Sequence, residues 1–197
     1  MNTDAIINIP KISCQYLEEP LLSFANGEQH IDPKFGILQF GPKSYSPLKR
    51  HPSQVRVGFI GSAETIEIAQ KWIEGSAEGV AGDGKHPNFP GYKKEQGFFS
   101  ELVFDSDWRG QLNHSEIETI LKIKNSRNRF EECLKLLESK LNLLSRKDRQ
   151  PEYIIVVLPE KLVKKCRVVD YEDSILGRTH RDLRRAFKAV AMKYRMP

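Results

Sequence analysis

Four cationic side chains near the carboxyl end of the sequence have the types and the spacing to hold a phosphate. His180, Arg184 and Lys188 recur every four residues, and Arg181 lies three residues before Arg184. On an α-helix, this spacing places side chains one turn apart on one face. Arginine offers a planar fork of donors and lysine a compact point charge, and both are used to bind phosphate. Because like charges at this spacing repel each other, the pattern predicts a stripe that binds an anion.

The helix that positions this stripe is expected to begin at Thr179, because Thr179 and Asp182 have the spacing of a capping box. The first turn of such a helix carries unsatisfied N–H groups and a partial positive charge, which also favour a phosphate. A solvated basic helix without a ligand is the competing interpretation. Apolar residues recur at helical spacing and would face the core: Leu183, Phe187, Val190 and Tyr194.

The charge of the chain is distributed unevenly. The 197 residues carry a formal net charge of +5 at pH 7, with a pI near 9.0. Residues 161–197 contain 11 Lys and Arg against 4 Asp and Glu, whereas residues 1–160 contain 20 against 22. A basic excess gathered at one end favours a polyanionic partner, most often nucleic acid.

The composition also limits where the protein is expected to work. The mean hydropathy is −0.50. No run of about 18 apolar residues occurs, and the first residues lack the basic and apolar regions of a secretory signal. Three widely separated cysteines give no disulfide framework and no zinc motif, and they fit a reducing compartment. We therefore expect a cytoplasmic protein without a membrane partner. The cysteines are Cys14, Cys133 and Cys166.

Motifs for catalysis or metal binding are lacking. The histidines are scattered and form none of the spacings typical of zinc ligands. The glycine fingerprint of dinucleotide-binding folds, the P-loop and the hydrolase nucleophile motif are also missing. Asp105 and Asp107 form one carboxylate pair, which offers too few ligands for a divalent cation. We expect no catalytic residues, no metal ligands and no enzymatic activity.

The strands and helices that must position the cationic helix are expected from residue 54 onward. Residues 55–60 form a β-branched run that ends at Gly61, and helical periodicity follows from Ser62 to Gly75. A strand that feeds a helix through such a turn indicates parallel strands. Residues 75–97 are rich in Gly and Pro and indicate a surface insertion.

The second half of this region repeats the alternation of helix and strand. From Ser115 to Leu144 the apolar residues have helical spacing, and residues 125–128 could divide this stretch in two. Residues 153–158 are apolar throughout, as in a central parallel strand buried on both faces. The sequence thus predicts an α/β, Rossmann-like domain over residues 51–197, with a central parallel sheet flanked by helices.

The first 50 residues have a different character. Pro and Gly are too dense for a long helix, so we expect an extended arm or a small sheet. Residues 21–24 and 37–40 are short apolar runs that we interpret as strands. Isoleucines also alternate imperfectly around Pro10, at Ile6, Ile7, Ile9 and Ile12.

A set of short motifs in a fixed order covers nearly the whole chain. The motifs are Glu19–Phe24, Asp32–Ile37, Phe40–Pro42, Val55–Gly61, Asn88–Tyr92, Tyr153–Pro159, Arg181–Lys188 and Arg195–Pro197. In this order the chain resembles the short prokaryotic Argonaute proteins over their N-terminal segment and MID domain. Asn88–Tyr92 is similar to the family's FPGF loop, and Arg181–Lys188 to its MID helix.

The resemblance implies a MID domain that anchors the 5′ end of a guide strand. The family's pocket uses a Tyr, His or Arg four residues before a Lys, which Arg184 and Lys188 match. His180 and Arg181 would assist, and the segment 159–178 would contact the first base. The pocket's Gln and second Lys would lie beyond residue 197. No cofactor is implied, apart from a divalent cation that could accompany the guide phosphate.

The resemblance also implies partners. They are a single-stranded guide RNA or DNA with its target strand, a PIWI domain in the same or a separate chain, and an APAZ-containing effector of TIR or sirtuin type. The implied role is defence against invading DNA, without catalysis by this chain. One alternative is a scaffold that docks such an effector through its N-terminal arm and glycine-rich loop. A second is a small nucleotide-dependent enzyme, which the missing glycine fingerprint disfavours.

Overall fold

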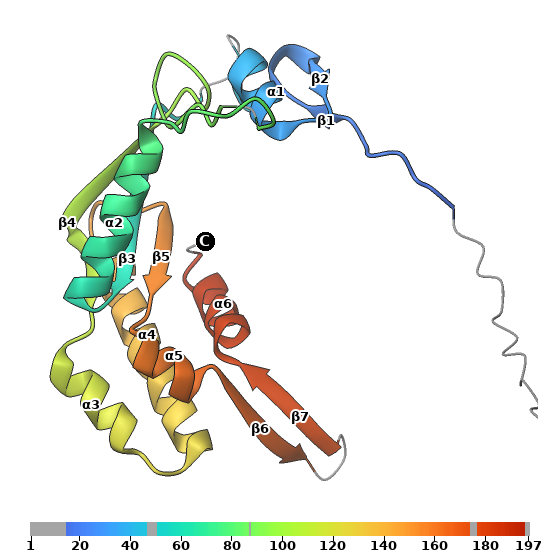
Figure 1. Cartoon of the computed structure of the whole chain (residues 1–197). Helices are drawn as coiled ribbons and strands as arrows, with labels where there is room; N and C mark the ends of the chain where they lie inside the picture. The colour runs from blue at the N-terminus through green and yellow to red at the C-terminus, as the bar shows by residue number, and fades with distance from the viewer. Residues whose placement is uncertain (1–14, 47–50, 87, 174–176, 196–197) are drawn as a thin grey trace, which may run out of the picture.

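The structure, a computed structural model, describes residues 15–46, 51–86, 88–173 and 177–195 (Figure 1). The isoleucine-rich start, Cys14 and the last two residues, on which parts of the sequence interpretation rest, lie outside the described residues. The described part is a mixed α/β structure built around a parallel sheet. None of its helices is both long enough and apolar enough to span a bilayer.

The sheet has three strands in the order β4-β3-β5. The central strand is β3 (Gln54–Gly61), which pairs in parallel with β4 (Glu101–Gln111) on one side and with β5 (Tyr153–Val157) on the other. Five successive residues at the end of β3 are buried, as expected for a strand covered on both faces. The predicted Rossmann-like core is confirmed as a parallel sheet flanked by helices. The prediction that residues 153–158 form a central strand buried on both faces is wrong, because β3 is the central strand and β5 pairs along one side only among the described residues. Tyr153 is exposed and the other residues of β5 are only partly buried.

One face of the sheet is covered by α2 (Ala63–Ala77). The hydroxyl of Ser62 accepts a hydrogen bond from the backbone N–H of Thr65, at 3.2 Å, and so caps the start of this helix, as predicted. Thr65 also donates its hydroxyl hydrogen to the carbonyl oxygen of Val157 at 2.6 Å, which fixes the helix to the end of β5. The buried Ile66 packs against Val57 and Phe59 of the central strand.

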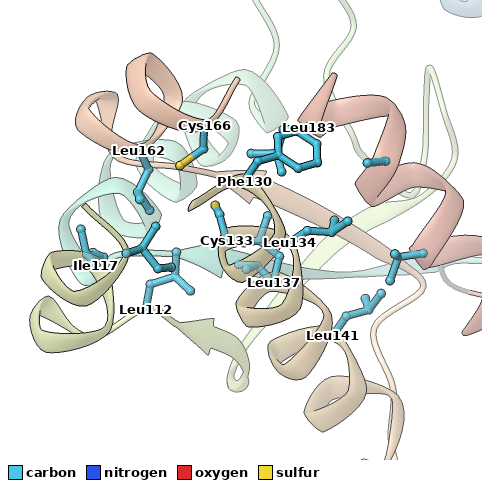
Figure 2. Close-up of a cluster of buried hydrophobic side chains, with 14 of the residues drawn as sticks. Leu112, Ile117, Phe130, Cys133, Leu134, Leu137, Leu141, Leu162, Cys166 and Leu183 are labelled. Atoms are coloured by element: carbon cyan, nitrogen blue, oxygen red, sulfur yellow. The ribbon is translucent and has the colours of Figure 1, made fainter. Parts of the chain in front are cut away.

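The other face carries the larger core, shown in Figure 2. Helix α4 (Ser126–Ser145) packs against the sheet on this face. Three further helices pack against α4: α3 (His114–Lys122), α5 (Glu160–Cys166) and α6 (Leu183–Lys193). The predicted division into two helices is confirmed, but the break lies at residues 123–125, slightly before the predicted 125–128. The Asn125 side chain accepts from the N–H of Asn128 and so caps the start of α4. Helix α4 supplies the centre of this core through Phe130, Cys133, Leu134, Leu137, Leu141 and Leu144.

An antiparallel hairpin projects from the body of the protein between α5 and α6 (Figure 1). It consists of β6 (Val168–Asp173) and β7 (Gly177–Asp182). The last helix was predicted to begin at Thr179, which is wrong, because Thr179 pairs with Tyr171 in this hairpin. The helix begins at Leu183 instead. Its cap is Asp182, whose carboxylate accepts from the N–H of Arg185 at 3.0 Å.

The N-terminal part folds into β1 (Leu22–Ser23), the short 3₁₀ helix η1 (Ala25–Gly27), β2 (Gln29–His30) and α1 (Pro33–Phe40). The strand predicted at residues 37–40 is therefore wrong. Asp32 accepts hydrogen bonds from the N–H groups of Lys34 and Phe35, which fixes a helical turn. Pro33 suits the first position of a helix, and Gly41, with a φ of 84°, ends it.

Contacts of aromatic side chains join this N-terminal part to residues 98–100, which follow the glycine-rich insertion. The rings of Tyr45 and Phe99 stack with centroids 3.9 Å apart. His51 Nε2 lies 2.9 Å from the hydroxyl of Ser100 and 2.9 Å from the carbonyl oxygen of Phe98. Residues far apart in the sequence thus meet directly before the start of β4, where the chain leaves the insertion.

Candidate nucleic-acid interface

Helix α6 is held on α4 along its whole length. Leu183, Ala186 and Val190 are buried in the larger core. At the far end of the helix, the hydroxyl of Tyr194 donates to a carboxylate oxygen of Glu138 on α4, at 3.4 Å. These contacts fix one side of α6 against the protein, so its opposite side faces solvent.

That solvent-facing side carries Arg184 and Lys188. Both side chains are exposed, and they lie one helical turn apart. Neither makes an ion pair or a hydrogen bond with another side chain among the described residues. Two cations held close together without a counter-charge repel each other, and an anion placed between them would remove that repulsion.

The structure separates the other two predicted residues from this pair. His180 and Arg181 lie on β7, where successive side chains point to opposite faces of the hairpin. His180 Nδ1 is 2.5 Å from a carboxylate oxygen of Asp170 on β6. The Arg181 guanidinium pairs with Glu131 of α4 and lies 5.3 Å from the ring centroid of Phe130. The four-residue stripe expected on one helix is therefore reduced to Arg184 and Lys188.

The first N–H groups of α6 are partly used inside the protein. The N–H of Leu183 donates to the carbonyl oxygen of Arg167 at 2.8 Å, and the N–H of Arg185 donates to Asp182. Fewer backbone donors are left for an external phosphate than at an uncapped helix start. An anion at this position would therefore depend mainly on the side chains of Arg184 and Lys188.

The hydrogen bond from Leu183 brings a further cation beside the site. Arg167, the residue after α5, is exposed and lies against the start of α6. The sequence predicts that the segment 159–178, which includes Arg167, contacts the first base, and it gives Arg167 no separate role at the phosphate. The feature of the sequence that could have pointed to Arg167 as a phosphate-binding residue is the dense cationic run from Lys161 to Arg167.

Three hollows of the surface lie elsewhere. Grooves of about 440, 440 and 420 Å³ lie between α3 and α4, beside β1 and β2, and beside the start of β4. Arg184 and Lys188 line none of these three. Their face of α6 is open, which suits an extended polyanion lying across the surface better than an enclosed small molecule.

Comparison with known proteins gives no identification. No model of a protein family matches the chain, and no curated protein is significantly similar to it in sequence. Among the described residues, no group of three or more His, Cys, Asp or Glu side chains is placed to hold a metal ion. Any functional assignment therefore rests on the arrangement of the residues described above.

Proposed function

We propose that this chain is a non-catalytic nucleic-acid-binding module in which Arg184 and Lys188 hold the 5′ phosphate of a guide strand. The observation that carries the proposal is the pair of exposed cations one turn apart on α6, without partners among the described residues. Arginine and lysine together provide a forked donor and a point charge for a terminal phosphate.

The surrounding fold is compatible with this role. Ligands of open α/β sheets bind beyond the carboxyl ends of the strands. The carboxyl end of β5 leads through α5 and the hairpin to the start of α6. Together with the ordered motifs of the sequence, this favours the MID domain of a short prokaryotic Argonaute acting in defence against invading DNA.

The partners in this proposal are a guide RNA or DNA and its target, a PIWI domain, and an APAZ-containing effector of TIR or sirtuin type. A divalent cation at the guide phosphate would need oxygen ligands from the nucleic acid itself. The side chains on this face of α6 are cationic and offer no carboxylate.

The test compares oligonucleotides of one sequence with a 5′ phosphate or a 5′ hydroxyl, by fluorescence polarisation. We expect the phosphorylated form to bind at least about 10-fold more tightly, because hydrogen bonds to a charged group contribute about 1.5–3 kcal/mol. The double variant Arg184→Glu/Lys188→Glu should abolish this preference. Arg185→Glu/Lys193→Glu changes the charge equally on other sides of the same helix and should retain it. Equal binding of both oligonucleotides by the unaltered protein contradicts the proposal.

A second candidate function is a scaffold that binds the effector protein. The observation that favours it is the outer side of α2, where Ile68 and Trp72 lie one turn apart and are 62% and 74% exposed. Both point away from the side on which Ile66 is buried. Exposed tryptophans of this kind often dominate the binding energy of protein interfaces.

Co-purification with an APAZ-containing effector tests this candidate. Trp72→Ala should weaken the complex, by about 2 kcal/mol if Trp72 is a dominant contact, without lowering the stability of the isolated chain. Oligonucleotide binding should remain unchanged. Loss of the complex in Arg184→Glu/Lys188→Glu, with Trp72→Ala unaffected, would instead assign effector docking to the basic helix.

A further inference from the structure

We propose that three cationic segments form one continuous track that holds the sugar-phosphate backbone of a single-stranded nucleic acid beyond its first phosphate. The segments are residues 122–129, residues 161–167 and the start of α6. The first two come from α3, α4 and α5, and neither belongs to the pair Arg184 and Lys188 that would hold the 5′ phosphate. The direction of the strand along the track rests on that proposal, whereas the existence of the track does not.

Backbone hydrogen bonds place the three segments side by side. Leu183, the first residue of α6, donates its N–H to the carbonyl oxygen of Arg167 at 2.8 Å. Arg129 Nε donates to the carbonyl oxygen of Lys165 at 3.1 Å. Arg129 Nη1 donates to the carbonyl oxygen of Ile123 at 2.7 Å. One guanidinium therefore ties the turn between α3 and α4 to the end of α5, and the end of α5 touches the start of α6.

The charge of this surface is strongly one-sided. Residues 122–129 contain four cations and no acid, and residues 160–167 contain four cations and one acid, Glu160. Lys164 pairs with Glu160 at 2.6 Å. The acids of α4 nearest to this surface have partners as well, since Glu131 pairs with Arg181 and Glu132 with Lys135. The side chains of Lys122, Lys124, Lys161, Lys165 and Arg167 are exposed.

The track lies on packed helices. Figure 2 shows Ile117 of α3, Phe130 and Cys133 of α4, and Leu162 and Cys166 of α5 gathered in the core between these helices. All five are buried. Because this core fixes the helices, the backbone positions that carry the cations are already set relative to one another before a ligand binds.

The chemistry of the track favours a nucleic acid over a membrane. A helix that binds an anionic bilayer needs large apolar side chains that insert between the lipids. Within these segments the exposed large apolar side chain is Val163, at 39%. A nucleic acid requires only a regular row of cations, because each neutralised phosphate releases condensed counterions.

The test uses the charge-reversed variant Lys124→Glu/Lys165→Glu/Arg167→Glu. A matched control reverses three exposed lysines remote in sequence from the track, as Lys34→Glu/Lys43→Glu/Lys85→Glu. Polarisation is measured with 5′-hydroxyl oligonucleotides of about 4 and about 16 nucleotides, the range of site sizes for single-strand binding modules. Omitting the 5′ phosphate separates this test from that of the 5′-phosphate site.

We expect the track variant to bind the longer oligonucleotide on the order of 100-fold more weakly at about 0.1 M salt. Each lost phosphate contact removes about 0.7 from the slope of log K against log salt, or about 5-fold at this concentration. The slope should therefore decrease by about 2. The control variant should change neither the affinity nor the salt slope. With the short oligonucleotide, the difference in affinity between the track variant and the unaltered protein should be smaller.

Three results would overturn the track. They are an unchanged salt slope in the track variant, an equal loss in the control variant, and a track variant that loses binding to phosphatidylserine vesicles while its oligonucleotide binding is unchanged. If the unaltered protein ignores the 5′ phosphate but the track variant still loses the long oligonucleotide, the 5′-phosphate site fails and the track stands.

Discussion

At the scale of single residues, the packing of the N-terminal part depends on a glycine. Gly36 lies in the middle of α1 beneath the ring of Phe24. A Cβ at this position would lie 2.1 Å from the end of that ring, far inside contact distance. Since Phe24 is itself buried, the ring has little room to move away. The close approach of α1 to the segment before it therefore requires glycine.

We expect Gly36→Ala to loosen the N-terminal part by about 1–3 kcal/mol, the usual cost of overpacking. Hydrogen exchange should show faster exchange over residues 22–41 and no change in α4. Gly75→Ala is the matched control, because nothing lies within 4 Å of a Cβ at that helical position. It should stabilise α2 by about 0.5–1 kcal/mol. Unchanged exchange over residues 22–41 in Gly36→Ala would contradict the close packing of Phe24.

At the scale of elements, a partly buried ion pair joins α3 to α4. The ammonium group of Lys140 lies 2.6 Å from one carboxylate oxygen of Glu116, and the two side chains are 12% and 30% exposed. The other carboxylate oxygen of Glu116 accepts from the N–H of Asn113 at 2.7 Å and completes the cap of α3. Burial acts to raise the pKa of Glu116, but the hydrogen bonds from Lys140 and Asn113 and the charge of Lys140 outweigh it, so the pKa lies below its ordinary 4.5.

This depressed pKa predicts a pH dependence of stability. In the unfolded chain Glu116 takes up a proton near pH 4.5, whereas in the folded protein it remains ionised to lower pH. Its contribution is therefore fully present above about pH 4.5 and is lost as the pH falls through the folded pKa. Urea unfolding between pH 7 and pH 3 should show a shallower acid loss in Glu116→Gln than in the unaltered protein. Parallel curves for the two proteins would show that the pair does not act in this way.

The elements also show which features a sequence can predict. The strands at residues 54–61 and 153–157 follow from apolar runs next to turn residues, and α2 and α4 follow from their periodicity. The apolar run 37–40 is too short for its spacing to distinguish a helix from a strand. It is part of a helix because Asp32 caps the start of that helix with two hydrogen bonds. Thr179 and Asp182 are both acceptable caps. Asp182 is the cap because Thr179 is taken up by the pairing of β7 with β6, and local sequence does not encode that pairing.

In the candidate site, too, local spacing could be predicted from the sequence, whereas contacts that depend on the fold could not. Arg184 and Lys188 share a face because helical spacing is a local property, and the sequence predicted it correctly. His180 pairs with Asp170 because the two residues lie opposite each other in the hairpin, which helical spacing does not show. Arg181 pairs with Glu131, which is 50 residues away in the chain. The role of Arg129 likewise depends on carbonyl oxygens of residues that only the packing of α3, α4 and α5 brings together.

At the scale of the whole molecule, the larger core links the basic surface to the sheet. Leu137 of α4 is buried in the cluster that also contains Ile60 of β3 and Leu183 and Val190 of α6. The elements that carry the cations and the sheet that supports them therefore share one set of contacts. We infer that they unfold together, as one cooperative unit.

Leu137→Ala tests this cooperativity. The cavity should lower the free energy of unfolding by about 2–5 kcal/mol, and hydrogen exchange should accelerate equally in α6 and β3. Leu143→Ala is the control on the same helix. Its side chain is 58% exposed, and its loss should change stability by no more than about 0.5 kcal/mol. Faster exchange in α6 alone would show that the basic surface unfolds independently of the sheet.

The position of β5 at the edge of the sheet has a practical consequence. In the part of the chain that the structure describes, β5 pairs along one side only, and its five residues are all apolar and at least partly accessible. An edge of this composition is a template on which a foreign strand can add, the usual beginning of aggregation. Pro151 and Pro159 flank the strand and confine that template to a few residues, because proline cannot extend the ladder. We therefore expect concentrated protein to aggregate less when a bound partner covers this edge and prevents the addition of a strand.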